Sequence, residues 1–347
     1  MRSVFFIVTG FMLLVSAMTA RADELSIFIW SEYIDPELVE AFEKDTGTKV
    51  NISLYESTEQ MLAKLQAAGG TRQFDIIVAS NEALESMVAL KLVQAIDASK
   101  VPNAAGVMKQ FNKPVYDPQG EFSVPYQWGT VGLMWDSEKV KVDDAPSWNV
   151  IFGGNAPGTF VLLDTLRDQI GVALKHLGHS ANSQDPDQVK AAGKLVLDAK
   201  KSDKCVGFDG SVGGKNKVLA GQAALAVVYN GEALRAQEEK ESIAFAVPKE
   251  GGLLWVDLML LSSGAKNPDA AHKFMNYILD PEVNAKLSDF NFFATPVKKS
   301  LELIDPEARA NPAIYPDDET MDRMEFLQDV GDATRLYDEI WTAVKSR

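Results

Sequence analysis

The sequence predicts an α/β protein of two lobes, each lobe a mostly parallel sheet flanked by helices. Strand patterns alternate with helix patterns through the first third of the chain, and the alternation resumes between about Asp136 and Leu254. Such alternation is typical of parallel strands joined by crossover helices. The chain has 347 residues, 46% of them hydrophobic, which is long enough for two lobes, each with its own core.

The first 22 residues have the pattern of an export signal. Arg2 supplies a positive charge, residues 4–15 form an almost unbroken apolar run, and residues 20–22 match an A-x-A cleavage site. The run is too short for a comfortable membrane span, and no cysteine beside the cleavage site could carry a lipid. We therefore expect a protein that begins near Asp23 and, in a Gram-negative bacterium, is free in the periplasm.

The first elements after this signal are a buried strand at residues 25–30 and a helix. Asp35 is placed to cap the helix, Pro36 takes its first position, and Gly47 ends it. Between strand and helix lies the acidic and aromatic turn WSEY, residues 30–33. Because open α/β sheets bind ligands at the carboxyl ends of their strands, this turn is a candidate ligand site for an organic cation.

The next elements bring a second turn to the same place. A strand at residues 50–54 precedes a helix that opens with a capping box formed by Ser57 and Gln60. A short apolar strand at residues 74–78 then delivers residues 80–82 to the edge that also carries Trp30. Two strand-to-helix turns therefore converge on one crevice.

The middle of the chain repeats this organisation. A strand at residues 160–163 ends in the acidic segment 164–168, and a second buried strand at 223–228 leads into residues 229–232. A helix runs from Asp185-Pro186 to about residue 200. The glycine-rich segment 210–214 lacks the spacing of a phosphate-binding loop, so we predict an ordinary loop there.

The last third of the chain returns to the first lobe and then ends on a docked helix. A strand at residues 253–257 continues through 258–261, helices follow at 268–279 and 281–287, and Leu336, Ile340 and Val344 share one face of a terminal helix. We predict residues 1–22 as signal peptide, residues 23–135 plus 256–297 as the N-terminal lobe, and residues 136–255 plus 298–347 as the C-terminal lobe, with short strand-like crossovers between the lobes.

Charge and composition exclude several classes of function. The formal net charge of −15 argues against nucleic acid and anionic lipid as partners and is compatible with a cationic ligand. Cys205 is the only cysteine, so no disulfide can form within the chain, and we expect this thiol to be buried and inert. His176 and His179 are three residues apart, but no third metal ligand lies nearby, so they indicate a solvated helix face. Fingerprints of serine hydrolases, P-loops and dinucleotide sites are absent. We expect no catalytic residue, cofactor or metal.

Short motifs spread in order over the chain resemble the periplasmic polyamine-binding receptors of ABC importers, specifically the spermidine/putrescine group. The motifs are IWSEY at 29–33, TGTKV at 46–50, YESTEQMLAKL at 55–65, FDIIVAS at 74–80, VPYQWGTVGLMW at 124–135, YNGEA at 229–233, PKEGGLLWVD at 248–257, NPAIYPDD at 311–318 and QDVG at 328–331. The resemblance implies the two-lobed flytrap fold of periplasmic binding proteins. It also implies a non-enzymatic receptor, by default a monomer, that delivers its ligand to a membrane permease and ATPase.

The resemblance also assigns a ligand site. Its residues are Trp30, Ser31, Glu32, Tyr33, Ser80, Asp168, Tyr229, Trp255, Asp257 and Phe293. Within this set the resemblance makes Trp255 an aromatic wall and Asp257 the main carboxylate for an amine. The spermidine-type pattern has a second acid where this chain has Thr165, and a glutamine where it has Leu327. These two departures favour a diamine, putrescine, over spermidine.

Carboxylates and aromatic rings suit such a ligand for physical reasons. Carboxylates make charge-assisted hydrogen bonds to ammonium groups, and aromatic faces stack on methylenes and attract the cationic ends by roughly 0.5–2 kcal/mol each. We expect Asp257 to bind one end of the ligand, with Glu32 and Asp168 as candidates for the other. Two alternatives remain open: a flytrap receptor for another small solute, such as a sugar, thiamine or iron, and an enzyme or sensor domain.

Overall fold

The computed structural model describes residues 23–143 and 146–347, so the predicted signal peptide lies outside the described residues. The strands are β1 (Glu24–Trp30), β2 (Lys49–Tyr55), β3 (Ile76–Ser80), β4 (Val93–Gln94), β5 (Ser123–Asp136), β6 (Phe160–Leu163), β7 (Cys205–Asp209), β8 (Leu225–Tyr229), β9 (Ile243–Ala246), β10 (Leu253–Ser262) and β11 (Glu325–Phe326). The α-helices are α1 (Pro36–Thr46), α2 (Thr58–Gln66), α3 (Leu84–Ala89), α4 (Asn149–Phe152), α5 (Leu166–His176), α6 (Pro186–Lys200), α7 (Ser211–Leu219), α8 (Asn230–Glu239), α9 (Pro268–Ile278), α10 (Pro281–Asn291), α11 (Pro306–Ala310), α12 (Asp318–Met321) and α13 (Thr334–Ser346). The predicted α/β class is confirmed.

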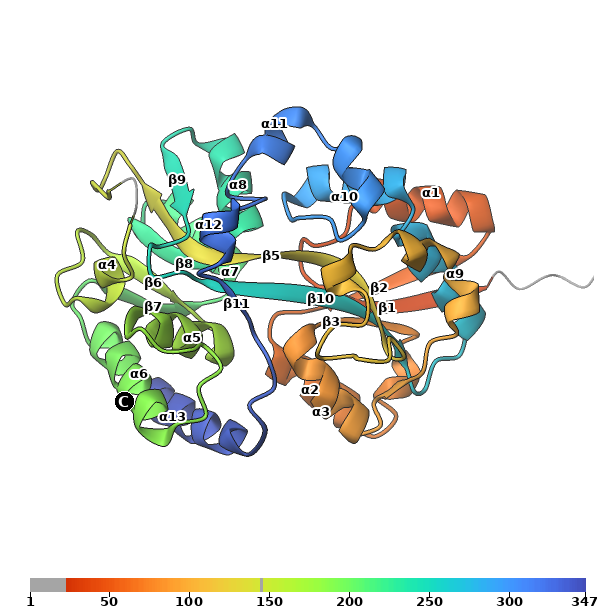
Figure 1. The fold of residues 1–347 in the computed structure, drawn as a ribbon, viewed down its shortest axis with the longest axis horizontal. Coiled ribbons are helices and arrows are strands. Elements are labelled where there is room, and N and C mark those ends of the chain that lie inside the picture. Colours follow the sequence, from red (N-terminus) through yellow and green to blue (C-terminus); the bar gives the residue numbers. More distant parts are fainter. Residues whose placement is uncertain (1–22, 144–145) are drawn as a thin grey trace, which may run out of the picture.

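The strands form one continuous mixed sheet that passes through two halves of the molecule (Figure 1). The strand order is β2-β1-β3-β10-β5-β8-β6-β7, with β4 and β11 paired to β10 and β9 paired to β5. Pairing is parallel within β2-β1-β3 and within β8-β6-β7, and antiparallel wherever β5 or β10 joins β3, β8 or each other. Each half is therefore a parallel sheet completed by antiparallel strands from the centre.

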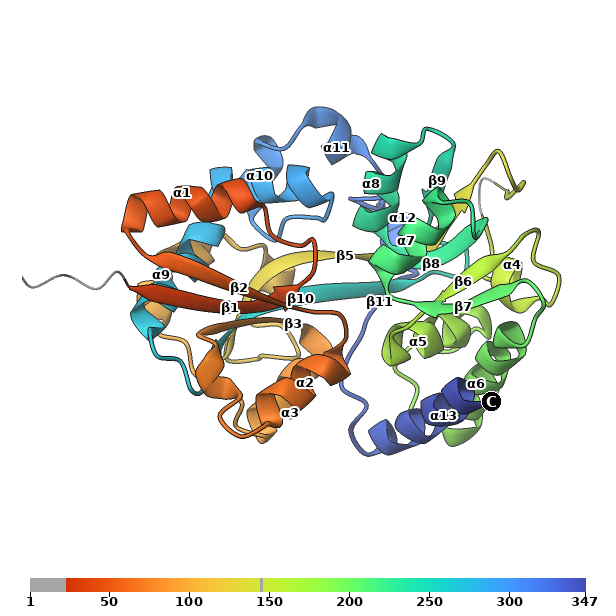
Figure 2. The same cartoon turned by 180° about the vertical axis from the view of Figure 1, so that it is seen from behind.

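Helices cover both faces of the sheet in the first half, as the alternation of side chains along β1 requires. Ile27 packs in a cluster with Phe42 of α1 and Phe274 of α9, whereas the next residue, Phe28, points to the opposite face and packs with Met61 of α2. Figures 1 and 2 show α1 and α2 on opposite sides of these strands. Each such buried side chain contributes about 1.5–3 kcal/mol to stability.

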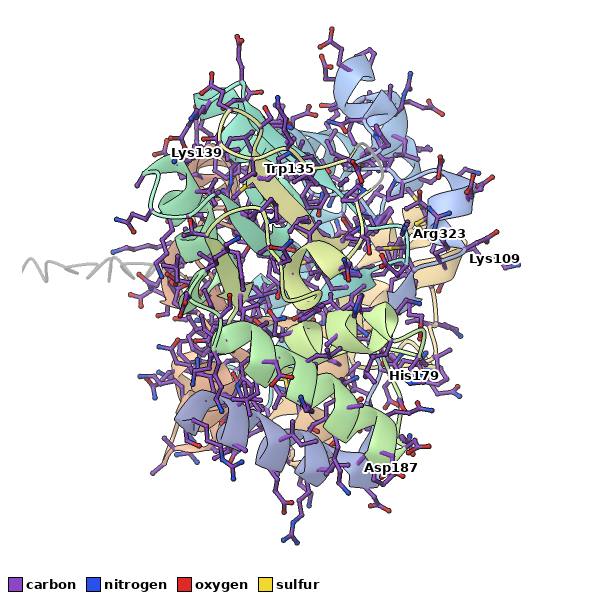
Figure 3. All side chains as sticks on the ribbon, turned by 90° about the vertical axis from the view of Figure 1, so that its left-hand side faces the viewer. Lys109, Trp135, Lys139, His179, Asp187 and Arg323 are labelled. Carbon is purple, nitrogen blue, oxygen red and sulfur yellow. The ribbon has the colours of Figure 1, made fainter. Side chains whose placement is uncertain are left out.

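In the second half, helices also cover both faces of the sheet. Val227 of β8 faces a cluster that includes Ile170 of α5 and Val189 of α6, and Val228 faces Ala233 of α8. The terminal helix α13 packs on α5 and α6, as its apolar face predicts, and the three helices lie together in the end-on view (Figure 3).

The long strands β5 and β10 pass from one half of the molecule to the other. They run antiparallel over residues 123–131 of β5 and 253–260 of β10. The register shifts between Asp257 and Leu258, and such irregularities re-aim side chains near binding sites. After α10 the chain continues beside that helix, where the Ser300 hydroxyl donates to the Pro281 carbonyl, before β11 pairs with β10.

One local prediction is wrong. The glycine-rich segment 210–214 is not a loop, because Ser211 to Gly214 form the first turn of α7. A Cβ atom at Gly213 would lie 2.1 Å from the Asp209 carboxylate, and Gly214 lies against Ala226 and Val228 of β8. The glycines thus let α7 begin in close contact with Asp209 of β7 and with the side chains of β8. Tertiary packing imposes this requirement, and turn propensity alone does not reveal it.

Candidate functional site

A pocket lies where the two halves meet, beside the middle of β10. It has a volume of about 760 Å³, part of which is open to solvent. The carboxyl ends of β1 and β3 reach it from the first half, and the segments that follow β6 and β8 reach it from the second half. Its lining residues are Trp30, Ser31, Tyr33, Glu56, Thr58, Ser80, Glu82, Thr165, Asp168, Gly210, Ser211, Val212, Tyr229, Glu232, Trp255, Asp257 and Phe293.

Aromatic rings pack edge to face along one side of this pocket. Trp255 is the centre of the group, with ring centroids 4.9 Å from Phe293, 5.6 Å from Tyr229 and 6.4 Å from Tyr33. Two glycines make room for these rings. A Cβ atom at Gly129 would lie 2.5 Å from the Trp255 ring, and a Cβ atom at Gly231 would lie 2.5 Å from the Phe293 ring. The result is a rigid apolar wall, of the kind that packs well against methylene groups.

Asp257 lies at the register shift of β10, next to this wall, and is only 6% exposed. Burial, together with the charge of Glu82, raises the pKa of its carboxyl group to about 7, against the opposing effects of the neighbouring Tyr33 and Trp30 side chains. The Tyr33 hydroxyl and the Trp30 indole N–H are themselves buried without hydrogen-bond partners. Asp257 is therefore a desolvated acid in the pocket, with no cation from the protein beside it.

Asp168 is a second buried acid, on the opposite half of the molecule. It lies in the first turn of α5, is 3% exposed, and accepts a hydrogen bond of 3.1 Å at Oδ2 from the Tyr229 hydroxyl. Its Oδ1 atom is buried and has no hydrogen-bond partner. Burial, followed by the charge of Glu82, raises the pKa of Asp168 to about 8, against the opposing effects of Tyr229 and Arg167.

Glu82 is a third acid in the lining, and the sequence-based site did not include it. It follows β3 in a short 3-10 turn, residues 81–83, which Asn81 anchors by donating from its side chain to the Leu327 carbonyl and accepting from the Val256 N–H. Its Oε2 atom is buried without a partner, and burial raises its pKa. The available signal was its position directly after a strand that ends at the site.

Glu32, in contrast, is not among the residues that line the pocket. Its backbone has a left-handed φ of 51°, and its carboxylate lies 3.2 Å from Lys215 and 3.5 Å from Arg235, both of the second half. Lys215 and Arg235 also pair with the buried Glu232. We call these four residues, Glu32, Lys215, Glu232 and Arg235, the ion-pair network. The structure thus brings all the predicted site residues together in the pocket except Glu32.

The remaining predicted residues take the following places. The Ser31 hydroxyl donates to Glu56 over 3.0 Å, and Ser80 lies opposite Asp257 in the β3–β10 ladder. Neither serine side chain caps a helix in the described residues. Of the two positions that depart from the spermidine-type pattern, Thr165 lines the pocket and Leu327 is buried in the hydrophobic core, 1% exposed.

The two histidines that the sequence singled out lie apart from the pocket. His176 lies 3.7 Å from Glu250 and packs against Phe152, and His179 lies just after α5 near the surface (Figure 3). Within residues 23–143 and 146–347, no group of three or more potential metal ligands occurs. Over the same ranges, no helix combines the length and apolarity needed to cross a membrane.

Comparisons with known proteins agree on one family. The family model described as "bacterial extracellular solute-binding protein" matches residues 37–316. The spermidine/putrescine-binding periplasmic protein of Salmonella typhimurium is 33% identical, over 95% of this chain and 94% of that protein. The putrescine-binding periplasmic protein PotF of Escherichia coli is 32% identical, over 98% and 96%. A solved structure described as a putative spermidine/putrescine ABC transporter from Listeria monocytogenes has a TM-score of 0.84 and 31% identity, covering 93% of this chain and 99% of that one.

Proposed function

This chain belongs to the bacterial extracellular solute-binding proteins, among the relatives of the spermidine/putrescine-binding periplasmic proteins, and from this premise we propose that it captures a polyamine between its lobes. The family is periplasmic and non-enzymatic. The bound polyamine is then delivered to the membrane permease of an ABC importer, and the receptor works as a monomer.

One observation carries the proposal: buried carboxylates that have no cation of their own stand against an aromatic wall. Asp168 and Asp257 are almost fully buried, Glu82 has a buried oxygen without a partner, and no lysine or arginine is among the lining residues. Burying a charge is costly unless it is paired. A ligand that brings ammonium groups supplies the missing partners, and its methylenes fit the aromatic wall.

We assign the two ends of a diamine to opposite sides of the pocket. Asp257 binds one ammonium group beside Trp30 and Tyr33, and Asp168 binds the other beside Tyr229. Trp255 and Phe293 cover the methylene chain, and Ser31 and Ser80 line the pocket mouth as neutral contacts. Glu32 contributes through the ion-pair network rather than by direct contact with the ligand.

Closure of the two lobes completes the site in this proposal. The N-terminal lobe is residues 23–135 plus 256–297, and the C-terminal lobe is residues 136–255 plus 298–347, so the chain passes between the lobes three times: in β5, in β10 and after α10. A hinge in these strands lets Asp257 and Asp168 approach one ligand from two sides. Closure also removes water, which strengthens the charged contacts.

Putrescine is the preferred ligand over spermidine in this proposal. Thr165 offers a hydroxyl where a carboxylate would be needed for a further ammonium group, and Leu327 is apolar and directed into the core. A third cation would be left poorly paired in the closed pocket, at a cost of several kcal/mol. Putrescine has two cations and avoids this cost.

Other solutes fit less well. A zwitterionic amino acid needs a cation for its carboxylate, and the lining residues include none. A neutral sugar would leave the three acids without partners, so they would stay protonated or pay the full desolvation cost.

Calorimetry tests the proposal. The protein is unfolded, dialysed and refolded to remove co-purified ligand, and is then titrated with putrescine and with 1,4-butanediol, its neutral isostere. We expect micromolar binding or tighter for putrescine, about −8 kcal/mol, and no measurable binding for the diol. Equal affinities, or binding of a sugar or an amino acid in place of any polyamine, would contradict the proposed function.

A further inference from the structure

We propose that Glu82 is a ligand residue and that it binds the same ammonium group as Asp168, so that this end of the ligand ties the two halves of the protein together. The inference rests on the proposed function, because it assigns a new role within the same pocket. It replaces Glu32, which the sequence suggested as the partner of Asp168, with an acid that the structure places in the lining.

The first argument is geometric. Glu82 comes from the first half, directly after β3, and Asp168 comes from the second half, in the first turn of α5. Both line the same pocket, and each has one buried carboxylate oxygen without a hydrogen-bond partner, Oε2 of Glu82 and Oδ1 of Asp168. The other oxygen of Asp168 is already held by Tyr229. Two free acceptors from opposite halves thus share one pocket, and Tyr229, which donates to Asp168, packs against Trp255 in the same lining.

Most of the charged groups that act on Glu82 are acidic. Arg167 of α5 is the cation that faces it, and the other charged groups that act on it are acidic: Asp168 of α5, Glu59 of α2, Asp329 after β11 and Asp257 of β10. No described lysine or arginine forms an ion pair with Glu82 within 4.0 Å.

Arg167 is in fact committed to other partners. Its guanidinium donates to the Gln328 carbonyl over 2.8 Å and to Asn182 over 3.1 Å, and it lies 5.0 Å from the centre of the Tyr337 ring. These contacts hold it to the C-terminal segment. Glu82 is therefore surrounded mainly by acids. The two terminal nitrogens of Arg167 donate to other groups, and its Nε–H, although it has no partner, forms no hydrogen bond with Glu82. A ligand ammonium group would supply the missing partner of Glu82.

The consequence is a link between ligand charge and closure. In the empty pocket the two carboxylates repel, and the charge of Glu82 raises the pKa of Asp168. An ammonium group between them attracts both carboxylates, outweighs their mutual repulsion and favours their ionised forms, so binding near neutral pH releases protons. A diamine joins the halves through this group, which a neutral isostere could not do.

A double-mutant cycle tests whether the two acids share one ammonium group. Glu82→Gln and Asp168→Asn should each weaken putrescine binding at least tenfold. The fold-loss of putrescine affinity in the double variant should be clearly smaller than the product of the two single fold-losses. The reason is that the second substitution removes an interaction that the first has already broken. Losses that simply multiply would overturn the shared assignment.

A second readout separates ligand contact from a structural role. Calorimetry in buffers of different ionisation heat counts protons released on binding, and Glu82→Gln should release fewer than wild type whereas Glu82→Asp should restore much of the release. Glu85→Gln, an exposed acid on the adjoining α3, is the matched control and should change neither value. Thermal melting of each variant checks that it is folded.

The outcomes distinguish the two proposals. If wild type binds putrescine and Glu82→Gln matches it in affinity and proton release, the inference about Glu82 is overturned and the proposed function stands. If wild type binds no polyamine at all, the proposed function fails first.

Discussion

Two groups of acids lie at the boundary between the halves of this protein, and they differ in one respect. In the ion-pair network, Glu32 and Glu232 are paired with Lys215 and Arg235. Glu82, Asp168 and Asp257 line the pocket, as Glu232 also does, but these three acids form no ion pair with a described lysine or arginine within 4.0 Å. The protein therefore supplies the cations for one group and leaves the other incomplete.

The contrast separates acids that form ion pairs within the protein from acids that we propose to pair with the ligand. Arg235 donates to the Glu32 backbone carbonyl over 2.8 Å and lies 3.5 Å from its carboxylate, so the network connects the turn after β1 to α8. Asp168 and Asp257 are almost fully buried, and the protein gives Asp168 a hydrogen bond from Tyr229 but gives neither acid an ion-pair partner within 4.0 Å. Residue type alone does not distinguish the two groups, but the presence of a partner does.

The largest expected effect is a loss of putrescine affinity when an acid of the pocket is replaced. Asp257→Asn should weaken putrescine binding by roughly 3–5 kcal/mol, because it leaves a desolvated ammonium group without its counter-charge. Glu32→Gln, in the network, should have a much smaller effect, and Ser31→Ala should cost about 1 kcal/mol. Calorimetry on the three variants makes the comparison. Equal losses for Asp257→Asn and Glu32→Gln would remove the distinction between the two groups.

The network should instead control stability. Lys215 is 5% exposed, and Lys215→Met leaves the buried Glu232 with one cation fewer, so we expect a loss of about 3 kcal/mol in the free energy of unfolding. Lys217→Met on the same helix breaks only the partly exposed pair with Asp209 and should cost less than about 1 kcal/mol. Urea denaturation of both variants, without ligand, measures the difference. A Lys215→Met protein as stable as Lys217→Met would contradict the structural role of the network.

The raised pKa values of the pocket acids should also make the stability of the protein depend on pH. The pKa values of Asp168, about 8, and Asp257, about 7, are raised in the folded protein, so between about pH 4 and pH 8 the folded state holds more protons than the unfolded state. This contribution makes the ligand-free protein more stable as the pH falls from 8 toward 5.

Thermal melting between pH 5 and pH 8, with and without saturating putrescine, tests this sign. We expect the melting temperature of the ligand-free protein to rise on acidification, and putrescine to stabilise most at the alkaline end, where the acids are ionised. A ligand-free protein whose stability falls steadily from pH 8 to pH 5 would contradict the raised pKa values.

A smaller effect is expected for ligand preference. Thr165→Asp combined with Leu327→Gln should shift preference from putrescine toward spermidine by about tenfold, or ~1.4 kcal/mol. The reason is that the two substitutions supply a carboxylate and an amide for the third ammonium group. Competition calorimetry on wild type and the double variant decides it, and a wild type that already prefers spermidine would refute the preference while leaving polyamine binding intact.

Much of the fold follows from local patterns that tertiary contacts do not override. The cap at Asp35, the proline after it and the left-handed Gly47 delimit α1 where the sequence indicates. The two turns predicted to converge, at residues 30–33 and 80–82, do meet at the pocket. Such features depend on residues close together in the chain, so they can be predicted from it.

The errors and omissions share a different physical origin. Whether Glu32 is free for a ligand depends on Lys215 and Arg235, more than 180 residues further along the chain. The start of α7 depends on how closely Gly213 approaches Asp209. Long-range pairing and close packing are set by the assembled structure, and no local pattern in the sequence encodes them.

The central claim, that the pocket acids are completed by the ligand, can be measured directly. Carbon-13 labelling of the aspartate carboxyl groups, with Asp168→Asn and Asp257→Asn for assignment, lets NMR titration report each pKa. We predict values near 8 and 7 in the ligand-free protein, in line with their burial, and a fall of both to the ordinary carboxyl range or below at saturating putrescine. Ordinary pKa values in the empty protein, or raised values that putrescine leaves unchanged, would contradict the account.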